Sequence, residues 1–251
     1  MLTLALLFGC STQGAVIEGR VQDIWNNPVE GATVMLVGGT ERPLTDASGR
    51  YEVPRMEGTH LMKAGRMGYI QEHVELVVAA GETPPGPTFT LHPKPDGPGL
   101  YLVQRGAGSY HRLTPARVRS VGNALRAYRG IDAVGEALAE SASPAVVFHT
   151  DLRHDELMRL GLTLHRLDYV RTAMVPSSMG DTEVQINRYI AAEEVDIELR
   201  PLRSKTDYLI EISSLEPGVY AFQTQDMLQM DPPAFDAIPD ELRVIFPFEV
   251  R

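Results

Sequence analysis

Residues 45–53 decide the fold of the first part of the chain, and they read Thr45-Asp46-Ala47-Ser48-Gly49-Arg50-Tyr51-Glu52-Val53. Asp46 can accept hydrogen bonds from backbone amides two residues further on, and Gly49 can adopt a positive φ and form a bulge that starts a strand. Tyr51 and Val53 then alternate with polar residues, which places both on one face of that strand. The stretch therefore predicts a tight turn followed by a half-buried strand.

Other short strands are predicted on both sides of this turn. They share near-alternation of apolar and polar residues and are separated by loop-forming residues, most clearly at 23–28. The runs lie at residues 16–21, 29–37, 60–64, 74–78 and 88–91. Many short strands with frequent turn signals are typical of an all-β sandwich.

The order of the turn and core residues resembles the carboxypeptidase regulatory-like domain, a transthyretin-like fold. The motifs are Gly19-x-Val21, Pro28-Val29-x-Gly31-Ala32-x-Val34, Thr45-Asp46-x-x-Gly49-x-Tyr51, Gly58 and Gly68-Tyr69. The resemblance covers residues 15–92. It implies an immunoglobulin-like sandwich that serves as an accessory or interaction module and has no peptidase activity. It also implies structural roles for the glycines in turns, for Asp46 in a loop and for Tyr51 in the core.

Residues 1–10 predict a lipoprotein signal segment. An apolar run of this length that is closed by a small residue is typical of a secretory signal. Leu7-Phe8-Gly9-Cys10 resembles the lipobox of bacterial lipoproteins, and Cys10 is the only cysteine in the chain. The resemblance implies acylation of Cys10, for example with palmitate, and therefore attachment to a membrane. Ser11 implies sorting to the outer membrane. The alternative is an apolar N-terminal stretch in which the cysteine occurs by chance.

Composition excludes some partners. The chain has 251 residues and a formal net charge of -10, so no nucleic-acid partner is expected, because phosphate binding needs clustered Lys and Arg. No apolar run reaches the roughly 20 residues that a membrane-spanning helix needs. No cofactor is expected.

A second domain is predicted after a linker at residues 93–98, where three prolines favour an extended, semi-rigid backbone. Residues 99–251 are assigned to no family from their sequence and are expected to be β-rich with one or two short helices. Strands are predicted at 100–103, 145–148, 164–175, 182–190, 193–203, 206–214, 218–224 and 244–250. Helices are predicted at 114–128, where Val118, Val121, Leu125 and Tyr128 recur at helical spacing, at 132–140, and within 151–160.

One cluster has side chains that could bind a metal: His149, Asp151 and His154. Two imidazoles and a carboxylate are suitable ligands for zinc or iron. Their spacing matches no established ligand motif, so a solvated loop in which Asp151 caps a short helix is the preferred interpretation. Metal binding by Asp23 or Asp46 is a lesser alternative to turn capping at those positions.

Nucleophilic catalysis has little support in the sequence. Gly-x-Ser-x-Gly is absent, and Gly106-Ala107-Gly108 lacks the strand and helix that a phosphate-binding loop needs. Trp25, the only tryptophan, lies in a predicted loop, where it could contact a sugar or a protein or be partly buried. Residues 227–233 form an apolar loop that is expected to pack over a core edge.

Together these features predict a non-catalytic, lipid-anchored protein of the bacterial outer membrane. Its expected role is structural or in protein interaction, with the membrane bound through Cys10 and a protein partner in the envelope. One alternative is a glycan-binding module that uses Trp25. A less favoured one is a metal-dependent hydrolase that uses His149, Asp151 and His154.

Overall fold

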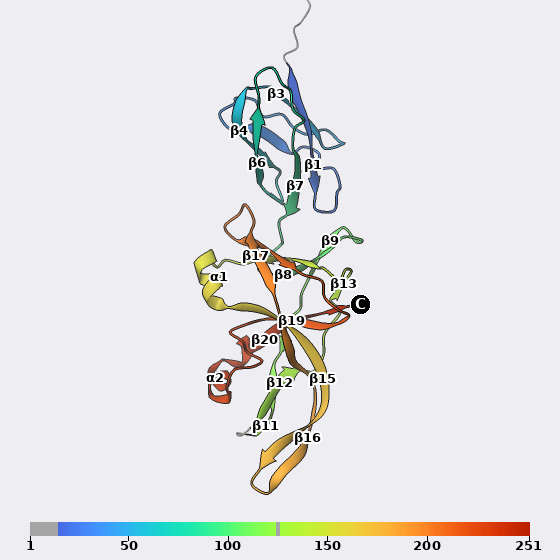
Figure 1. The fold of residues 1–251 in the computed structure, drawn as a ribbon, viewed down its shortest axis with the longest axis vertical. Helices are drawn as coiled ribbons and strands as arrows, with labels where there is room; N and C mark the ends of the chain where they lie inside the picture. Colours follow the sequence, from blue (N-terminus) through green and yellow to red (C-terminus); the bar gives the residue numbers. More distant parts are fainter. Residues whose placement is uncertain (1–14, 124–125) are drawn as a thin grey trace, which may run out of the picture. The chain divides into compact units, whose positions relative to one another are not determined.

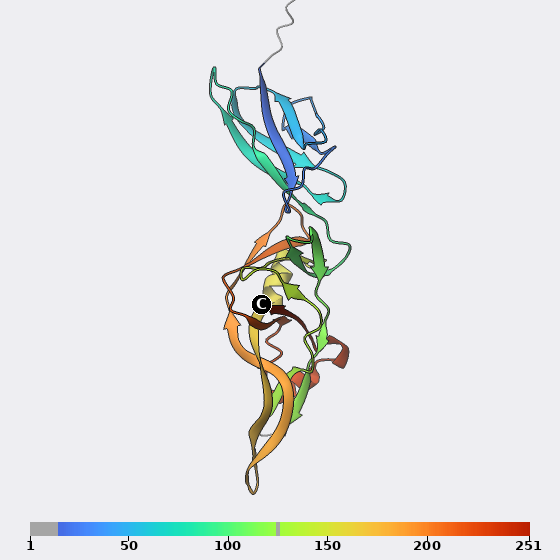
Figure 2. The same ribbon diagram turned by 90° about the vertical axis from the view of Figure 1, so that its right-hand side faces the viewer.

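A computed structural model describes residues 15–123 and 126–251 of the chain (Figures 1 and 2). The chain divides into two compact units, of which the first ends at Lys94 and the second begins at Pro95. The fold is mainly β, as predicted. Among the described residues, no helix has the length and apolarity needed to cross a membrane.

The first unit is a β-sandwich of two sheets. One sheet has the order β3 (Arg50–Pro54), β1 (Val16–Asp23), β7 (Thr88–Pro93) and β5 (Tyr69–Ile70); the other has the order β2 (Thr33–Leu36), β4 (Gly58–Gly65) and β6 (Glu72–Val78). β1 pairs with β3 in antiparallel and with β7 in parallel orientation. Alternate residues of both sheets form one buried cluster that includes Ile17, Val34, Tyr51, Met62 and Phe89. The predicted sandwich is therefore confirmed.

The turn at residues 45–53 forms as predicted. Oδ1 of Asp46 accepts hydrogen bonds from the backbone amides of Ser48 and Arg50, both at 2.8 Å. Gly49 has φ 75°, and a Cβ atom at this position would lie 2.3 Å from the carbonyl oxygen of Val21. Tyr51 is buried in the core, and its hydroxyl donates a hydrogen bond of 2.8 Å to the carbonyl oxygen of Pro87. Residues 45–53 thus form the turn and also place Tyr51 in the core of the first unit.

The second unit contains two larger sheets. The five-stranded sheet has the order β17 (Ile197–Pro201), β18 (Asp207–Ile212), β14 (Ala145–His149), β8 (Gly99–Gln104) and β9 (Ser109–Arg112). The eight-stranded sheet has the order β10 (Ala116–Arg117), β20 (Val244–Val250), β19 (Gly218–Thr224), β15 (Leu162–Ser177), β16 (Gly180–Val195), β12 (Ala127–Ile131) and β11 (Arg119–Gly122), with β13 (Leu138–Ala139) pairing with β20.

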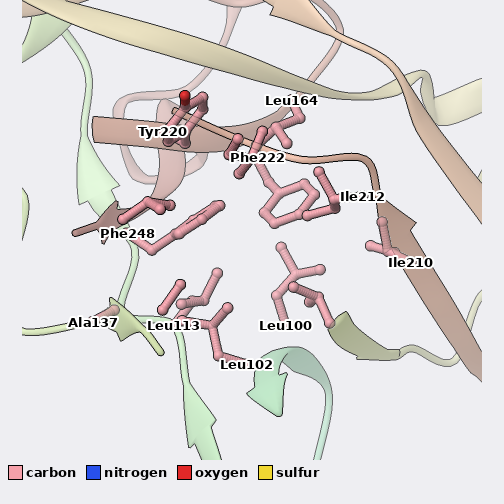
Figure 3. Close-up of a cluster of buried hydrophobic side chains, with 14 residues drawn as sticks. Leu100, Leu102, Leu113, Ala137, Leu164, Ile210, Ile212, Tyr220, Phe222 and Phe248 are labelled. Carbon is pink, nitrogen blue, oxygen red and sulfur yellow. The ribbon is translucent and has the colours of Figure 1, made fainter. Parts of the chain in front are cut away.

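The core of the second unit lies on both faces of the eight-stranded sheet. Leu164, Phe222 and Phe248 face the five-stranded sheet and pack against Leu100 and Ile210 (Figure 3). The opposite face carries a smaller cluster that is covered by the segment around α2 (Pro232–Ala237) and is made up of Val118, Ile131, Leu167, Ala221, Met227, Leu228, Phe235 and Ile245. The apolar loop at 227–233 therefore packs over a core edge, as expected, and it continues into a helix that was not predicted.

Two of the predicted helices are wrong. Residues 114–128 contain β10, β11 and the start of β12 instead of a helix. Val121 and Tyr128 are directly opposite each other in the antiparallel β11–β12 pair, so the apolar spacing reflects cross-strand pairing. Gly122 has φ 131°, which no helix allows. Leu125, the remaining residue of that pattern, lies outside the described residues.

The second incorrect helix is the one at 132–140. Leu138 and Ala139 form β13 and pair in parallel with Glu249 and Val250 at the end of the chain. A local pattern does not reveal a partner more than 100 residues away. The third prediction is confirmed, since α1 (His154–Leu160) lies within residues 151–160. The prediction of a β-rich second domain with one or two short helices also holds.

Candidate functional site

The longest hairpin of the molecule is formed by β15 and β16, each of 16 residues. The two strands pair from Leu164 and Val195 to the last pair at Ser177 and Gly180. The hydroxyl of Ser177 donates a hydrogen bond of 2.6 Å to the carbonyl oxygen of Gly180 and closes the turn. We call residues 168–190, the outer part of this hairpin, the arm; it extends beyond the rest of its sheet (Figure 1).

The arm begins where the pairing with β19 ends. β19 pairs with the first residues of β15, and the last pair joins Leu167 to Val219. The other side of the arm is supported by β12, through pairs between Gly130 and Ile190 and between Ile131 and Tyr189. The ladders with β19 and β12 therefore both end at the base of the arm, and in the described part of the chain no further strand pairs with the arm beyond Tyr189.

Polar contacts tie the arm to the neighbouring β11–β12 hairpin. The side-chain amide of Asn123 donates a hydrogen bond of 2.7 Å to the carbonyl oxygen of Pro176, near the end of the arm. Arg188 forms an ion pair with Asp132, which also lies 3.6 Å from the guanidinium of Arg119. These contacts keep the arm aligned with β11 and β12.

The arm carries large exposed apolar side chains. Met179 in the turn is 96 % exposed, Met174 is 49 % exposed and Tyr169 is 48 % exposed. Tyr169 lies opposite Tyr189, with ring centroids 5.1 Å apart in an edge-on arrangement. A rigid two-stranded support with apolar side chains at its end is suited to contact another macromolecule.

The histidine cluster predicted at 149–154 does not converge. His149 is buried at the end of β14, and its Nδ1 lies 2.7 Å from Oδ1 of Asp207, the residue opposite it on β18. The ring of His154 instead stacks on Tyr208, with centroids 5.9 Å apart, while Asp151 is exposed. Within residues 15–123 and 126–251, no group of three or more His, Cys, Asp or Glu side chains is placed to hold a metal ion.

The partner of His149 could not be found from the sequence. Asp207 is 1 % exposed and its other carboxylate oxygen accepts hydrogen bonds from the hydroxyls of Ser204 and Thr206. Asp207 lies 58 residues from His149, and only the pairing of β14 with β18 brings them together. The pair thus joins two neighbouring strands, and Nδ1 of His149 and both carboxylate oxygens of Asp207 have partners within the fold.

The capping role expected of Asp151 is wrong. α1 begins at His154, and its N-cap residue is Arg153. The backbone amide of Arg153 donates a hydrogen bond of 2.9 Å to the carboxylate of Glu156, and this bond lowers the pKa of Glu156 from its usual range. The helix therefore starts with one half of a capping box, in which the carboxylate of its third residue accepts a hydrogen bond from the backbone amide of its N-cap residue.

Trp25 lies in a turn of the first unit and is partly buried. Oδ1 of Asp23 accepts hydrogen bonds from the backbone amides of Trp25 and Asn27, both at 2.9 Å. Asn26 between them has φ 67°. Asp23 is thus occupied in turn capping, and the turn holds the backbone of Trp25 in one conformation. Cys10, the predicted lipidation site, lies outside the described residues.

Two further features could not be predicted. The ring of Phe235 in α2 contacts two guanidinium groups, those of Arg129 and Arg243, whose Cζ atoms lie 4.8 Å and 4.7 Å from its centroid. His165 is 1 % exposed on β15; its ring nitrogens accept or donate no hydrogen bond to described residues, and Nε2 lies 3.9 Å from Asp226. The residues of each group come together only through tertiary structure.

Comparison with known proteins gives one family. Residues 16–92 match the carboxypeptidase regulatory-like domain, which confirms the resemblance predicted for this part of the chain. No curated protein matches the chain. Similar solved structures include the crystal structure of BcpA, the major pilin subunit of Bacillus cereus, at 10 % identity and TM-score 0.24, covering 94 % of this chain and 67 % of that chain. A variant of the same pilin has 12 % identity, TM-score 0.25 and the same coverage. Likeness at this level carries no argument about function.

Proposed function

We propose that this chain is a non-catalytic protein of the bacterial envelope that binds a protein partner through its arm. The observation that supports the proposal best is the arm itself. It places Met179 and Met174 in solvent at the end of a support held by Asn123 and by the ion pair of Arg188 with Asp132. Exposed apolar side chains in such a position weaken solubility unless a partner covers them.

The first unit supports a role in presenting a binding surface to a partner. The polar residues of its motifs are used inside the fold, since Asp23 and Asp46 hold turns and the hydroxyl of Tyr51 binds a backbone carbonyl. The family match at residues 16–92 fits an accessory or interaction module. We propose that the first unit is an accessory module and that the second unit presents the arm to the partner.

The proposal places the protein at the outer membrane, anchored through a lipid on Cys10. It rests on the sequence Leu7-Phe8-Gly9-Cys10 and on Ser11. Metabolic labelling with a fatty-acid analogue tests the anchor, and a Cys10→Ala chain should take up no label. Label that persists in the Cys10→Ala chain would rule out this cysteine as the attachment site.

The partner surface is tested by capture from detergent-solubilised envelope. The chain with Met179→Asp should retain less of the partner than the native chain, because a carboxylate in an apolar contact must be desolvated. Met67→Asp is the matched control, since Met67 is 97 % exposed in a turn of the first unit. Equal capture by the native chain and by both variants would contradict a role for the end of the arm.

A further inference from the structure

The outer part of β15 has a free backbone edge. Residues 168–177 pair with β16 on one side. On the other side, the ladder with β19 ends at Leu167, and no strand among residues 15–123 and 126–251 continues it. In an antiparallel ladder the N–H and C=O groups of alternate residues point away from the neighbouring strand. The carbonyl oxygen of Pro176 already accepts a hydrogen bond from the side chain of Asn123, so the edge offers hydrogen-bonding groups over residues 168–175.

This edge has few of the features that usually block strand addition, and its proline lies at the outer end. Bulges, inward charges and prolines are the common protections of an edge. Both register shifts of the hairpin skip residues of β16, where Asn187 has φ 48°, so β15 itself stays continuous. Its only proline is Pro176, next to the turn, and its only charged side chains are Asp168 and Arg171.

The edge also has a composition that favours pairing. Tyr169, Val170, Thr172 and Val175 are residue types enriched in β-strands. Tyr169 is about half exposed, so a second strand beside it would bury apolar area that now contacts water. The edge thus combines free backbone groups with suitable side chains.

We propose that residues 169–175 pair in antiparallel orientation with the same residues of a second copy of this chain, with Thr172 on the two-fold axis. This inference specifies the partner in the proposed function and rests on it. The register places Val170 opposite Met174, Tyr169 opposite Val175 and Thr172 opposite Thr172. Arg171 then lies opposite Ala173, so no two like charges face each other directly.

Charge selects this register over its neighbour. A two-fold axis perpendicular to the sheet requires that paired residues of the two strands point their side chains to the same face. The ladder must therefore be centred on a residue that lies opposite its own copy. The register centred on Arg171 would place two guanidinium groups opposite each other, which destabilises a ladder. The register centred on Val170 would pair only residues 168–172. The register centred on Ala173 would pair only residues 171–175 before it brings Val170 opposite Pro176, which has no N–H to donate.

Disulfide trapping tests the pairing in the full chain. With Cys10→Ser as background, Thr172→Cys introduces the only cysteine. In the proposed dimer two such residues are directly opposite, within the Cα separation of about 4.4–6.8 Å that a disulfide needs. Mild oxidation should therefore yield a covalent dimer. Thr182→Cys on β16, exposed and nearer the turn, is the control and should stay monomeric.

A second measurement gives the register independently. Chains with Val170→Cys should form few dimers alone, and so should chains with Met174→Cys, whereas a mixture should form the mixed dimer. A Thr172→Cys chain that folds and remains monomeric, or a mixture that gives no excess of mixed dimer, overturns the inference. Loss of envelope capture in Met179→Asp would still support the proposed function in that case. Dimers that form without any arm-dependent capture would support self-pairing and contradict the wider function.

Discussion

Nδ1 of His149 and Oδ1 of Asp207 lie 2.7 Å apart on neighbouring strands, and both residues are buried. Each residue is the last or the first of its strand, so the contact ties the end of β14 to the start of β18. With Ser204 and Thr206 bound to the same carboxylate, the group forms a small buried network at one end of the five-stranded sheet.

Asp207→Ala should destabilise the second unit. The change leaves the ring nitrogen of His149 and two hydroxyls without their acceptor in a buried place, at a cost of about 3 kcal/mol. Urea unfolding followed by circular dichroism measures the loss. Asp168→Ala removes an exposed carboxylate on the arm and should cost less than about 0.5 kcal/mol. Similar losses in the two variants would show that the buried network does not stabilise the sheet.

Gly49→Ala should destabilise the first unit much more than Gly81→Ala. Both glycines have φ 75°, so both substitutions incur the same backbone penalty of about 1 kcal/mol. At Gly49 the new methyl group would also lie 2.3 Å from the carbonyl oxygen of Val21, whereas at Gly81 nothing lies within 4 Å. Thermal unfolding of the two chains should therefore give a clearly lower midpoint for Gly49→Ala, and equal midpoints would refute the tight turn.

Asp46 should make the first unit sensitive to acid. Hydrogen bonds from the side chain of Ser48 and the amide of Arg50 lower the pKa of Asp46 below its usual value of 3.8. A group whose pKa is lowered by folding stabilises the protein above its unfolded-state pKa, and this contribution is lost as the pH falls through the folded-state pKa. The native chain should therefore be more stable than Asp46→Ala at neutral pH, and the difference should shrink in acid below the usual pKa.

Thermal midpoints measured across that pH range check this prediction. Glu41→Ala, at an exposed position of a loop in the same unit, is a suitable control and should differ little from the native chain at any pH. If the difference in thermal midpoint between the native and Asp46→Ala chains instead widens as the pH falls, the prediction is contradicted.

Phe235→Ala should destabilise the second unit by about 3–5 kcal/mol, the usual cost of removing a buried aromatic ring. The ring is 2 % exposed and contacts two guanidinium groups, one of which, that of Arg129, has its pKa lowered by burial. Leu242→Ala in the short 3-10 helix at Asp240–Leu242 is the control, because Leu242 is 60 % exposed. Denaturant unfolding should separate the two variants, and equal stability would mean that the α2 segment does not cover the core.

The sequence allowed prediction of those parts whose signals are local. The turn at Asp46 and Gly49 has its donors and acceptor within five residues, and the strands of the first unit are short and separated by clear turn residues. The family resemblance rested on these same positions. The alternating runs that became β18 and β19 were recognised for the same reason.

Features that depend on distant pairing could not be predicted. The sequence predicts Val121 and Tyr128 on one helical face because two turns of a helix and a short hairpin can both bring together residues seven positions apart. No local pattern around Asp207 predicts its contact with His149. The strands predicted at 164–175 and 182–190 likewise do not indicate where the pairing of β15 with β19 ends. The arm follows from strand lengths and order, which single residues do not encode.

Shortening the arm provides the most direct test of its role as the binding surface. Replacing residues 170–188 with an Asn-Gly turn joins Tyr169 to Tyr189, which already face each other, and leaves Leu164 and Leu167 in the core. The shortened chain should unfold cooperatively like the native chain but capture no partner from solubilised envelope. Capture that equals that of the native chain would contradict the proposal that the arm binds the partner.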